Sequence, residues 1–449
     1  MEDNKKESFP QKGKRKTSRS AILSIVIATL MLLVFMLGFV VRGATEHDYA
    51  RKINEIIKLI DNTSVYYDEK TADAAINGFV KTLLTNDKYA AYYSPEEYSR
   101  ILAEDTGKYS GVGLGFIKNG GDYDGTIGRV YLNSPAHKCG IQTGDKLVAG
   151  IFKGQSDYAY FAGLQGEDKT VLQVISEFFS EFGVGEEIKI KVVRGGEETE
   201  FTLEKAEYVA SYVEYKDDEK SCYFSTETGD FVNDGSVLET LSQDTAYIKL
   251  HEFEGGAASQ FGKAIEYMKS RGKTKLIIDL RDNGGGQITV LSDILSYIIN
   301  DNGANNVKIM NVKEKNSESS FSTSKNRYNA FLTDIAVIAN CGSASASEAL
   351  INALNDYGDR IKYKGAEFNL GRLILTQQHE IRQTYCTFGK GIMQTTYGLM
   401  SGGALVLTTA YVYSPLSNKC IQDIGIETTD AANCVIDENA IARADAVLH

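Results

Sequence analysis

The fold is decided around residues 275–286, which read KLIIDLRDNGGG. Four of the first six residues are aliphatic, so we expect a buried strand over 275–280 that runs into three glycines. A strand is also predicted over 245–250, an amphipathic helix over 257–271 and a further helix over 289–299. This alternation of strands and helices is typical of an α/β layer.

The glycine turn at the end of that strand allows two chemical interpretations. A nucleotide-binding loop would need Gly-x-Gly-x-x-Gly or Gly-x-x-x-x-Gly-Lys, and the turn has neither pattern. An oxyanion hole needs only one or two exposed N–H groups on a rigid turn. The turn therefore favours an oxyanion hole.

A second motif, GSASASE at 342–348, follows a predicted strand over 335–339. Ser345 and Glu348 have the spacing of a helix capping box, and in that interpretation the serine is structural. In the other interpretation Ser345 is a nucleophile, because the N–H of Ala346 and the helix dipole would face a developing oxyanion.

A third motif, TFGKG at 387–391, places Lys390 between two glycines. A serine hydroxyl becomes a good nucleophile only when a base removes its proton. A lysine serves as that base when its removal from water lowers its pKa toward neutrality. His251 and His379 are alternative bases, but neither has an evident orienting carboxylate motif. We therefore expect a serine–lysine hydrolase pair.

Short β runs separated by glycines occupy residues 107–205 and resemble a PDZ domain. The match rests on the segments GVGLGF at 111–116, SPAHKCGI at 134–141 and GDKL at 144–147, with a helix predicted over 171–182. Leu114, Gly115 and Phe116 match the carboxylate-binding loop of that family. In such a loop, backbone N–H groups converge on a terminal carboxylate while the peptide adds as an extra strand.

The three motifs occur in this order after a PDZ-like module, and together they identify a protein family far more specifically than any one motif does. Together they resemble the carboxyl-terminal processing proteases, also called tail-specific proteases. The resemblance covers about residues 87–430. It implies an α/β multidomain chain, with a PDZ domain over 107–205 and a crotonase-like α/β serine protease domain over 206–449.

Carried over position by position, the resemblance assigns the nucleophile to Ser345 and the general base to Lys390. Gln394 would orient the lysine through a hydrogen bond. The oxyanion would be held by the N–H groups of Ala346 and of one glycine in the turn, with Gly285 preferred and Gly286 the next candidate. The implied mechanism is acyl transfer, and it uses no metal and no organic cofactor.

The chain departs from the family pattern near the proposed base. Residues from about 366 to 385 form an insertion, which suits a harmless loop, a lid or a substrate-selecting edge equally well. Tyr385 and Cys386 stand where Glu and Pro are usual, and Gly284 stands in place of a proline. Asp356 matches an aspartate implicated in some members, and we expect a helix-surface role for it instead.

Residues 21–41 form an apolar run long enough to cross a bilayer as one helix. Seven Lys and Arg residues precede it, so the positive-inside rule predicts a cytoplasmic tail over 1–20 and a transmembrane anchor over 21–42. A cleaved signal peptide is the alternative, which the length of the run and its poor cleavage site disfavour. A helical segment is predicted over 43–106, with one helix starting at Ser94-Pro95.

Composition limits the partners. With 48 basic and 60 acidic residues, the formal charge of −12 argues against nucleic acid as a partner. The six cysteines match no zinc pattern, and disulfides and free thiols are equally compatible with an extracytoplasmic location.

The sequence therefore predicts a single-pass enzyme of the cell membrane, with its catalytic part outside the cytoplasm. It would be a serine endopeptidase whose PDZ domain recognises protein substrates with free, apolar C-termini. Assembly into homo-oligomers through helical ends is a further expectation from the resemblance. The alternative is a catalytically inactive, membrane-tethered PDZ scaffold that binds C-terminal peptides.

Overall fold

The computed structural model describes residues 48–63, 72–117, 123–165, 169–234, 241–300, 305–324, 327–358 and 366–449. The chain divides into two compact units, Met1–Ala75 and Ile76–His449. The tail and the anchor predicted over 1–42 lie outside the described residues. Among the helices that the structure does describe, none is both long and apolar enough to span a bilayer.

The described residues before the PDZ-like region are mostly helical. The first unit contains α2 (Asp48–Thr63), and α3 (Ala72–Leu83) begins at its end. In the second unit a short strand, β1 (Ala91–Tyr93), precedes α4 (Pro95–Asp105). The start of α4 is a capping box, because the Ser94 N–H donates to Glu97 Oε2 at 2.8 Å and the Glu97 N–H donates to Ser94 Oγ at 3.3 Å.

Residues 107–205 build a β-rich region with a hydrophobic core of its own, which includes Ile127, Leu147, Phe178 and Ile190. A four-stranded sheet has the order β6-β5-β7-β8, and β3 pairs with β4 alone as a two-stranded ribbon. The elements in chain order are β2 (Lys108–Gly111), β3 (Leu114–Phe116), β4 (Ile127–Val130), α5 (Pro135–Lys138), β5 (Lys146–Gly150), β6 (Ala159–Tyr160), the 3₁₀ turn η2 (Phe161–Leu164), α6 (Val171–Ser180), β7 (Glu187–Arg194) and β8 (Glu197–Glu204).

The second half of the chain is organised by a seven-stranded sheet of order β12-β11-β10-β13-β14-β17-β18. The four strands from β13 to β18 are parallel, and the others are antiparallel. The strands are β10 (Val213–Lys216), β11 (Ser221–Ser225), β12 (Asp230–Asn233), β13 (Thr245–Leu250), β14 (Lys275–Asp279), β17 (Asp334–Ala339) and β18 (Leu373–Leu375). Together with the helices, they confirm a mixed α/β multidomain fold.

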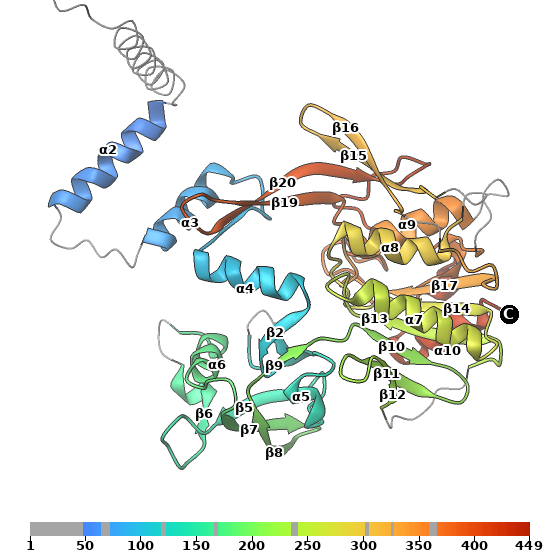
Figure 1. Ribbon diagram of the computed structural model, residues 1–449, viewed down its shortest axis with the longest axis horizontal. Coiled ribbons are helices and arrows are strands. Elements are labelled where there is room, and N and C mark those ends of the chain that lie inside the picture. The colour runs from blue at the N-terminus through green and yellow to red at the C-terminus, as the bar shows by residue number, and fades with distance from the viewer. Residues whose placement is uncertain are drawn as a thin grey trace, which may run out of the picture. The chain divides into compact units, whose positions relative to one another are not determined.

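Helices cover both faces of this sheet, which explains the continuous apolar run in β14. Leu276 and Ile278 pack on the side of α7 (Ala257–Ser270), α8 (Ile288–Ile298) and α9 (Ala346–Gly358). Ile277 points to the opposite side and packs with α10 (Ala440–Ala446). In Figure 1, α7 and α8 lie side by side in front of the sheet. Two further 3₁₀ turns, η4 (Ala431–Asn433) and η5 (Asp437–Asn439), lead into α10.

A second sheet has the order β1-β20-β15-β16, with β19 paired to β20. Its long strands are β15 (Lys308–Glu314), β16 (Glu318–Ser322), β19 (Ile392–Gly398) and β20 (Ala404–Tyr413). β1 pairs in register with β20, Ala91 opposite Val406. The segment just before the PDZ-like region therefore belongs structurally to the sheet that carries Gln394.

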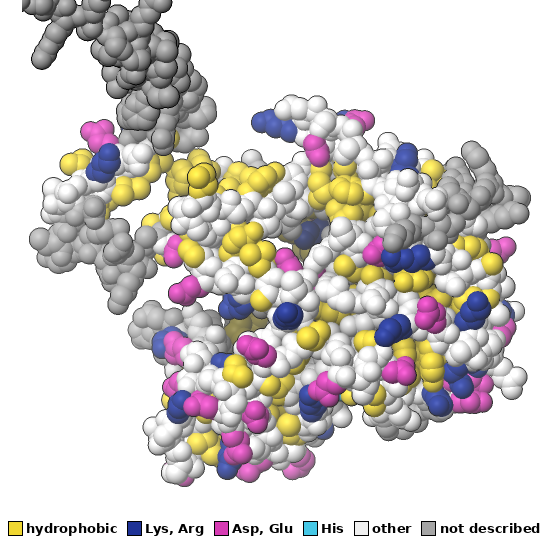
Figure 2. Space-filling view, in the orientation of Figure 1, with side chains coloured by type: hydrophobic (Ala, Val, Ile, Leu, Met, Phe, Trp, Pro, Cys, Tyr) yellow, Lys and Arg dark blue, Asp and Glu magenta, His cyan; other side chains and the backbone are white. Residues whose placement is uncertain are grey.

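The region between 206 and 244 differs from the irregular insertion or single hairpin that its polar composition suggests. Its described residues form four strands, of which β10 to β12 extend the seven-stranded sheet and β9 (Ala206–Val209) pairs with β2. The 366–385 insertion is also partly regular, since η3 (Leu370–Arg372) leads into β18, the edge strand of the same sheet. On the face shown in Figure 2, basic and acidic side chains are interspersed.

Candidate active site

A cavity of about 500 Å³ gathers the residues predicted to be catalytic. Ser345 and Ala346 reach it from the start of α9, Gly286 from the glycine turn, and Lys390 and Gln394 from the start of β19. Apolar side chains of α4, α8, β15 and β20 complete its walls. The structure thus brings together the nucleophile, base and orienting residue expected from motifs that are far apart in the chain.

Ser345 has a left-handed backbone conformation, with φ of 56°. Residues other than Gly, Asn and Asp rarely adopt it, and such strain concentrates at functional sites. Only half of the capping box forms: the Ser345 N–H donates to Glu348 Oε2 at 3.0 Å. Within the part of the chain that the structure describes, the Ser345 hydroxyl makes no hydrogen bond. It is therefore not used as a cap and stays available at the cavity.

Lys390 carries the features of a lysine base. Burial lowers the pKa of its ammonium below the ordinary value, while the charge of Glu348 opposes the shift. Its Nζ donates to Gln394 Oε1 at 2.8 Å and lies 5.2 Å from the centroid of the Tyr89 ring. No hydrogen bond joins Lys390 to Ser345 in this structure, as is common for catalytic pairs without substrate.

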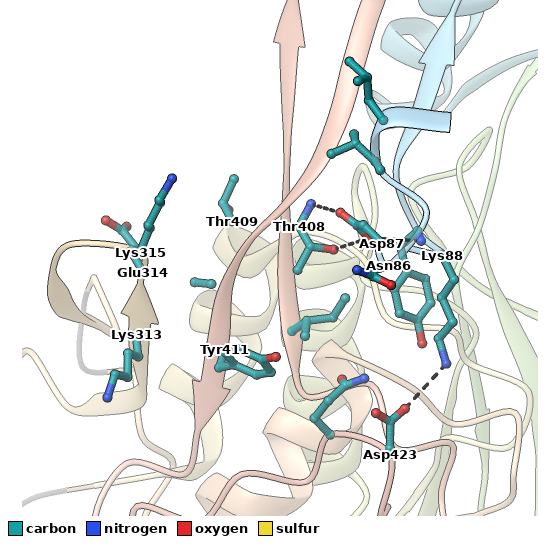
Figure 3. A pocket seen from close by; sticks show the side chains of 16 residues that line it. Asn86, Asp87, Lys88, Lys313, Glu314, Lys315, Thr408, Thr409, Tyr411 and Asp423 are labelled. Atoms are coloured by element: carbon teal, nitrogen blue, oxygen red, sulfur yellow. Dashed lines mark hydrogen bonds and ion pairs between the residues drawn. The ribbon is translucent and has the colours of Figure 1, made fainter. Parts of the chain in front are cut away.

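Gln394 is itself held by a segment that lies outside the three sequence motifs. Its Nε2 donates to the backbone carbonyl of Tyr89 at 2.9 Å. Figure 3 shows how this segment is anchored on β20: Asp87 accepts hydrogen bonds from the Thr408 N–H at 3.0 Å and the Thr408 hydroxyl at 2.8 Å. Asp87 and Tyr89 thereby support the base from outside the three motifs.

The hydrogen bonds of the glycine turn do not suit the preferred oxyanion donor, Gly285. The Gly285 N–H donates to Asn283 Oδ1 at 2.9 Å, and Gly285 is buried, so this N–H does not face the cavity. Gly286 is exposed, lines the cavity and, like Ala346, has an N–H that is not bonded to any described protein atom. The geometry therefore favours Ala346 and Gly286 as the donor pair.

Gly285 has a steric role instead. A Cβ atom at this position would lie 2.8 Å from Ala344 O, Ala346 N and Ser345 Cβ. Its φ of 101° is also unfavourable for other residues. The glycine thus lets the turn approach Ser345 closely.

Glu348 is the site residue whose role the sequence analysis missed, because its spacing from Ser345 made it look like a cap. Its carboxylate is fully buried on α9. Oε1 accepts hydrogen bonds from the Thr387 hydroxyl at 2.5 Å and the Gly389 N–H at 2.7 Å. Oε2 accepts them from the N–H groups of Lys390 at 2.9 Å and Ser345 at 3.0 Å. One carboxylate therefore links Ser345 to the loop that carries Lys390.

Replacing Glu348 with glutamine should weaken both folding and catalysis. The new amide NH₂ group would face two of the four donors, and each donor left unsatisfied costs about 1–3 kcal/mol. Misplacement of Lys390 by about 1 Å would lower kcat by about 10²-fold. Thermal unfolding and steady-state cleavage of an unfolded protein would measure the two effects.

Asp356 provides a matched control on the same helix. It is not on the helix surface, as we expected, but buried, and its Oδ2 accepts the N–H groups of Leu416 at 2.7 Å and Ser417 at 2.8 Å. Asp356→Ala should lower stability, because it removes this acceptor, and leave kcat unchanged, because Asp356 does not line the cavity. Equal kcat losses in both variants would contradict a specific role for Glu348.

The histidine alternatives find no support in the geometry. His251 is engaged by Glu214, with 2.5 Å between Nε2 and Oε1, and His379 accepts the Ile381 N–H at 3.3 Å. Neither histidine lines the cavity that holds Ser345. All six cysteines are free thiols. Among the described residues, no group of three or more His, Cys, Asp and Glu could hold a metal ion.

Comparisons with known proteins agree with the motifs. The model of peptidase family S41 matches residues 244–365, which include the glycine turn and Ser345. A probable CtpA-like serine protease from Staphylococcus saprophyticus is 24% identical over 435 residues, covering 93% of this chain and 74% of the relative. A similarly described protein from Staphylococcus aureus is 25% identical over 401 residues, covering 87% of this chain and 67% of the relative.

Solved structures with related chains include the photosystem II D1 C-terminal processing protease, with 18% sequence identity, a TM-score of 0.46 and 85% of each chain covered. A putative S41 protease from Bacteroides fragilis has 13% identity and a TM-score of 0.48, over 86% of this chain and 90% of the other. The family match includes the segment that carries Ser345, and the two staphylococcal relatives extend over most of the chain. Residues 244–365 therefore match peptidase family S41, and most of the chain is similar to CtpA-like serine proteases.

Proposed function

We propose that this peptidase is anchored in the cell membrane by residues 21–42 and cleaves protein substrates that it recognises by their free C-termini. Ser345 is the nucleophile and Lys390 the general base. The observation that carries the catalytic assignment is the cavity that Lys390 and Ser345 both line. In it Lys390 is desolvated and bonded to Gln394, and the Ser345 hydroxyl has no hydrogen bond to any residue that the structure describes.

Acylation begins when neutral Lys390 takes the proton of the Ser345 hydroxyl and Oγ attacks the scissile carbonyl carbon. The N–H groups of Ala346 and Gly286 donate to the oxyanion of the tetrahedral intermediate, and the N-terminal end of α9 adds its dipole. The Lys390 ammonium then protonates the leaving amine as the peptide bond breaks. Water attacks the acyl-enzyme with Lys390 again as base, which releases the new C-terminus and restores Ser345.

Gln394 and Tyr89 keep the lysine in position during this cycle. The Gln394 side chain accepts from the ammonium and donates to the Tyr89 carbonyl, so its amide orientation is determined at both ends. The Tyr89 ring face stabilises the ammonium once Lys390 has taken the proton.

The region 107–205 is the proposed PDZ domain that binds the substrate's tail. Leu114, Gly115 and Phe116 form β3, which is only partly buried. Among the described strands, β3 pairs with β4 alone, so its other edge is free to accept a peptide as a further strand. An apolar C-terminal residue would then pack beside this strand against the hydrophobic core of the region.

The test uses the full-length protein and an unfolded substrate with an apolar C-terminal residue, as the free carboxylate and as the amide. We expect cleavage of both, with a higher KM for the amide, because the amide lacks the charge that the N–H groups of the loop would bind. Ser345→Ala should bind the free tail without cleaving it. Equal KM values would contradict tail recognition, and binding without cleavage by the wild type would favour the scaffold alternative.

A further inference from the structure

The insertion ahead of Lys390 makes one set of contacts that points to a role in catalysis. Arg382 lies in this insertion and is partly buried. Its Nη2 donates to the carbonyl oxygens of Thr387 and Phe388, at 2.8 Å each. Both acceptors belong to the loop that carries Lys390, and the match to the family model ends before the insertion, at residue 365.

The same guanidinium also contacts the turn that closes over the loop. Arg382 Nη1 donates to the Asp423 carbonyl at 3.2 Å, and the Asp423 N–H donates to the Gly389 carbonyl at 2.9 Å. Arg382 Nε contacts Cys386 Sγ at 3.2 Å. The planar fork of arginine suits several acceptors at once, which a point charge such as lysine does not.

Arg382 and Glu348 contact complementary groups of the loop. Glu348 accepts from the Thr387 hydroxyl and from the N–H groups of Gly389 and Lys390. Arg382 donates to the carbonyls of Thr387 and Phe388. The N–H and O–H donors of the loop therefore bond to a residue of α9, and its carbonyl acceptors bond to a residue of the insertion.

We propose that Arg382 is a positioning residue for Lys390, so that the insertion is a working part of the catalytic apparatus and not a passive loop or a lid. Arg382 lies outside the cavity lining and acts through the loop backbone. Without its hydrogen bonds the loop shifts, the ammonium separates from Gln394, and water gains access to it. This inference rests on the proposed role of Lys390 as general base.

A purely structural role for Arg382 predicts a different pattern. It would lower the melting temperature and leave the properties of Lys390 in the folded protein unchanged. The positioning role predicts that kcat falls while KM stays the same, and that the pKa of Lys390 rises because the ammonium becomes better hydrated.

The experiment compares full-length wild type with Arg382→Gln, Arg382→Lys and Arg372→Gln. Arg372 is a matched control in the same insertion, since its guanidinium pairs with Asp334 at 2.7 Å and with the Glu367 carbonyl at 2.8 Å, away from the lysine loop. Labelling of Lys390 by acetic anhydride across a pH series, read by mass spectrometry, reports its pKa without requiring activity. Cleavage of an unfolded test protein, at a temperature where all variants are folded, gives kcat and KM.

For Arg382→Gln we expect a higher Lys390 pKa and a kcat lower by about 10- to 100-fold. Arg382→Lys should have a Lys390 pKa and a kcat between those of Arg382→Gln and the wild type. Arg372→Gln should have the wild-type Lys390 pKa and kcat. The proposal is overturned if Arg382→Gln has the same labelling profile of Lys390 and the same kcat as the wild type. The Lys390 pKa could rise in Arg382→Gln while Lys390→Ala cleaves as fast as the wild type. In that case Arg382 does position the loop, but Lys390 is not the general base.

Discussion

Replacing Ser345 with glycine is expected to abolish cleavage and to stabilise the fold at the same time. Loss of the nucleophilic oxygen should lower kcat by about 10⁶-fold, the scale seen when a serine peptidase loses its nucleophile. Glycine adopts φ of 56° without the steric cost that a Cβ atom brings, which is about 1 kcal/mol. The free energy of unfolding should therefore rise by about that amount, because the Ser345 hydroxyl makes no cap bond that would be lost.

The neighbouring Ser347 is the control for this effect. It is buried in the first turn of α9, has no positive φ, and its hydroxyl donates to the Asn283 carbonyl at 2.9 Å. Chemical denaturation of both variants would measure the two effects, and Ser347→Gly should have a lower free energy of unfolding than the wild type. If Ser345→Gly loses as much stability as Ser347→Gly, the strain at Ser345 is not real, and residual cleavage would exclude Ser345 as the nucleophile.

Replacing Lys390 with alanine should lower kcat by about 10⁴-fold, the upper range for loss of a general base. In the wild type, only the neutral amine can accept the serine proton, so kcat should rise with pH through the pKa of Lys390. Because burial lowers that pKa, the rise should lie below the ordinary titration range of lysine. Initial rates across a pH series would measure it.

Lys88 is the matched control for Lys390. Its Nζ also lies over the Tyr89 ring, 5.0 Å from the centroid, but it is exposed and pairs with Asp423 at 3.5 Å on the side shown in Figure 3. An exposed pair of this kind contributes little, so Lys88→Ala should keep both kcat and the pH profile. A pH profile that persists in Lys390→Ala would show that another group is the base.

Much of the α/β layer was predictable, because its signals are local. The apolar runs at 245–250, 275–280 and 335–339 became β13, β14 and β17, and the helices between them followed the expected periodicity. The strands between 213 and 233 were not predictable in the same way. They are short and rich in polar residues, and they become part of the sheet only because β10 finds β13 as a partner.

The sequence by itself predicted the chemistry of the site, because the residue types and their order name a serine, a lysine and a glutamine in one family pattern. Only the tertiary structure decided which groups surround them. It placed the Gly285 N–H on Asn283 and left Gly286 facing the cavity, and it made Glu348 a link between two loops. The physical reason is that burial and hydrogen-bond partners come from segments distant in the chain, so the pKa of Lys390 and the choice of oxyanion donors exist only in the folded arrangement.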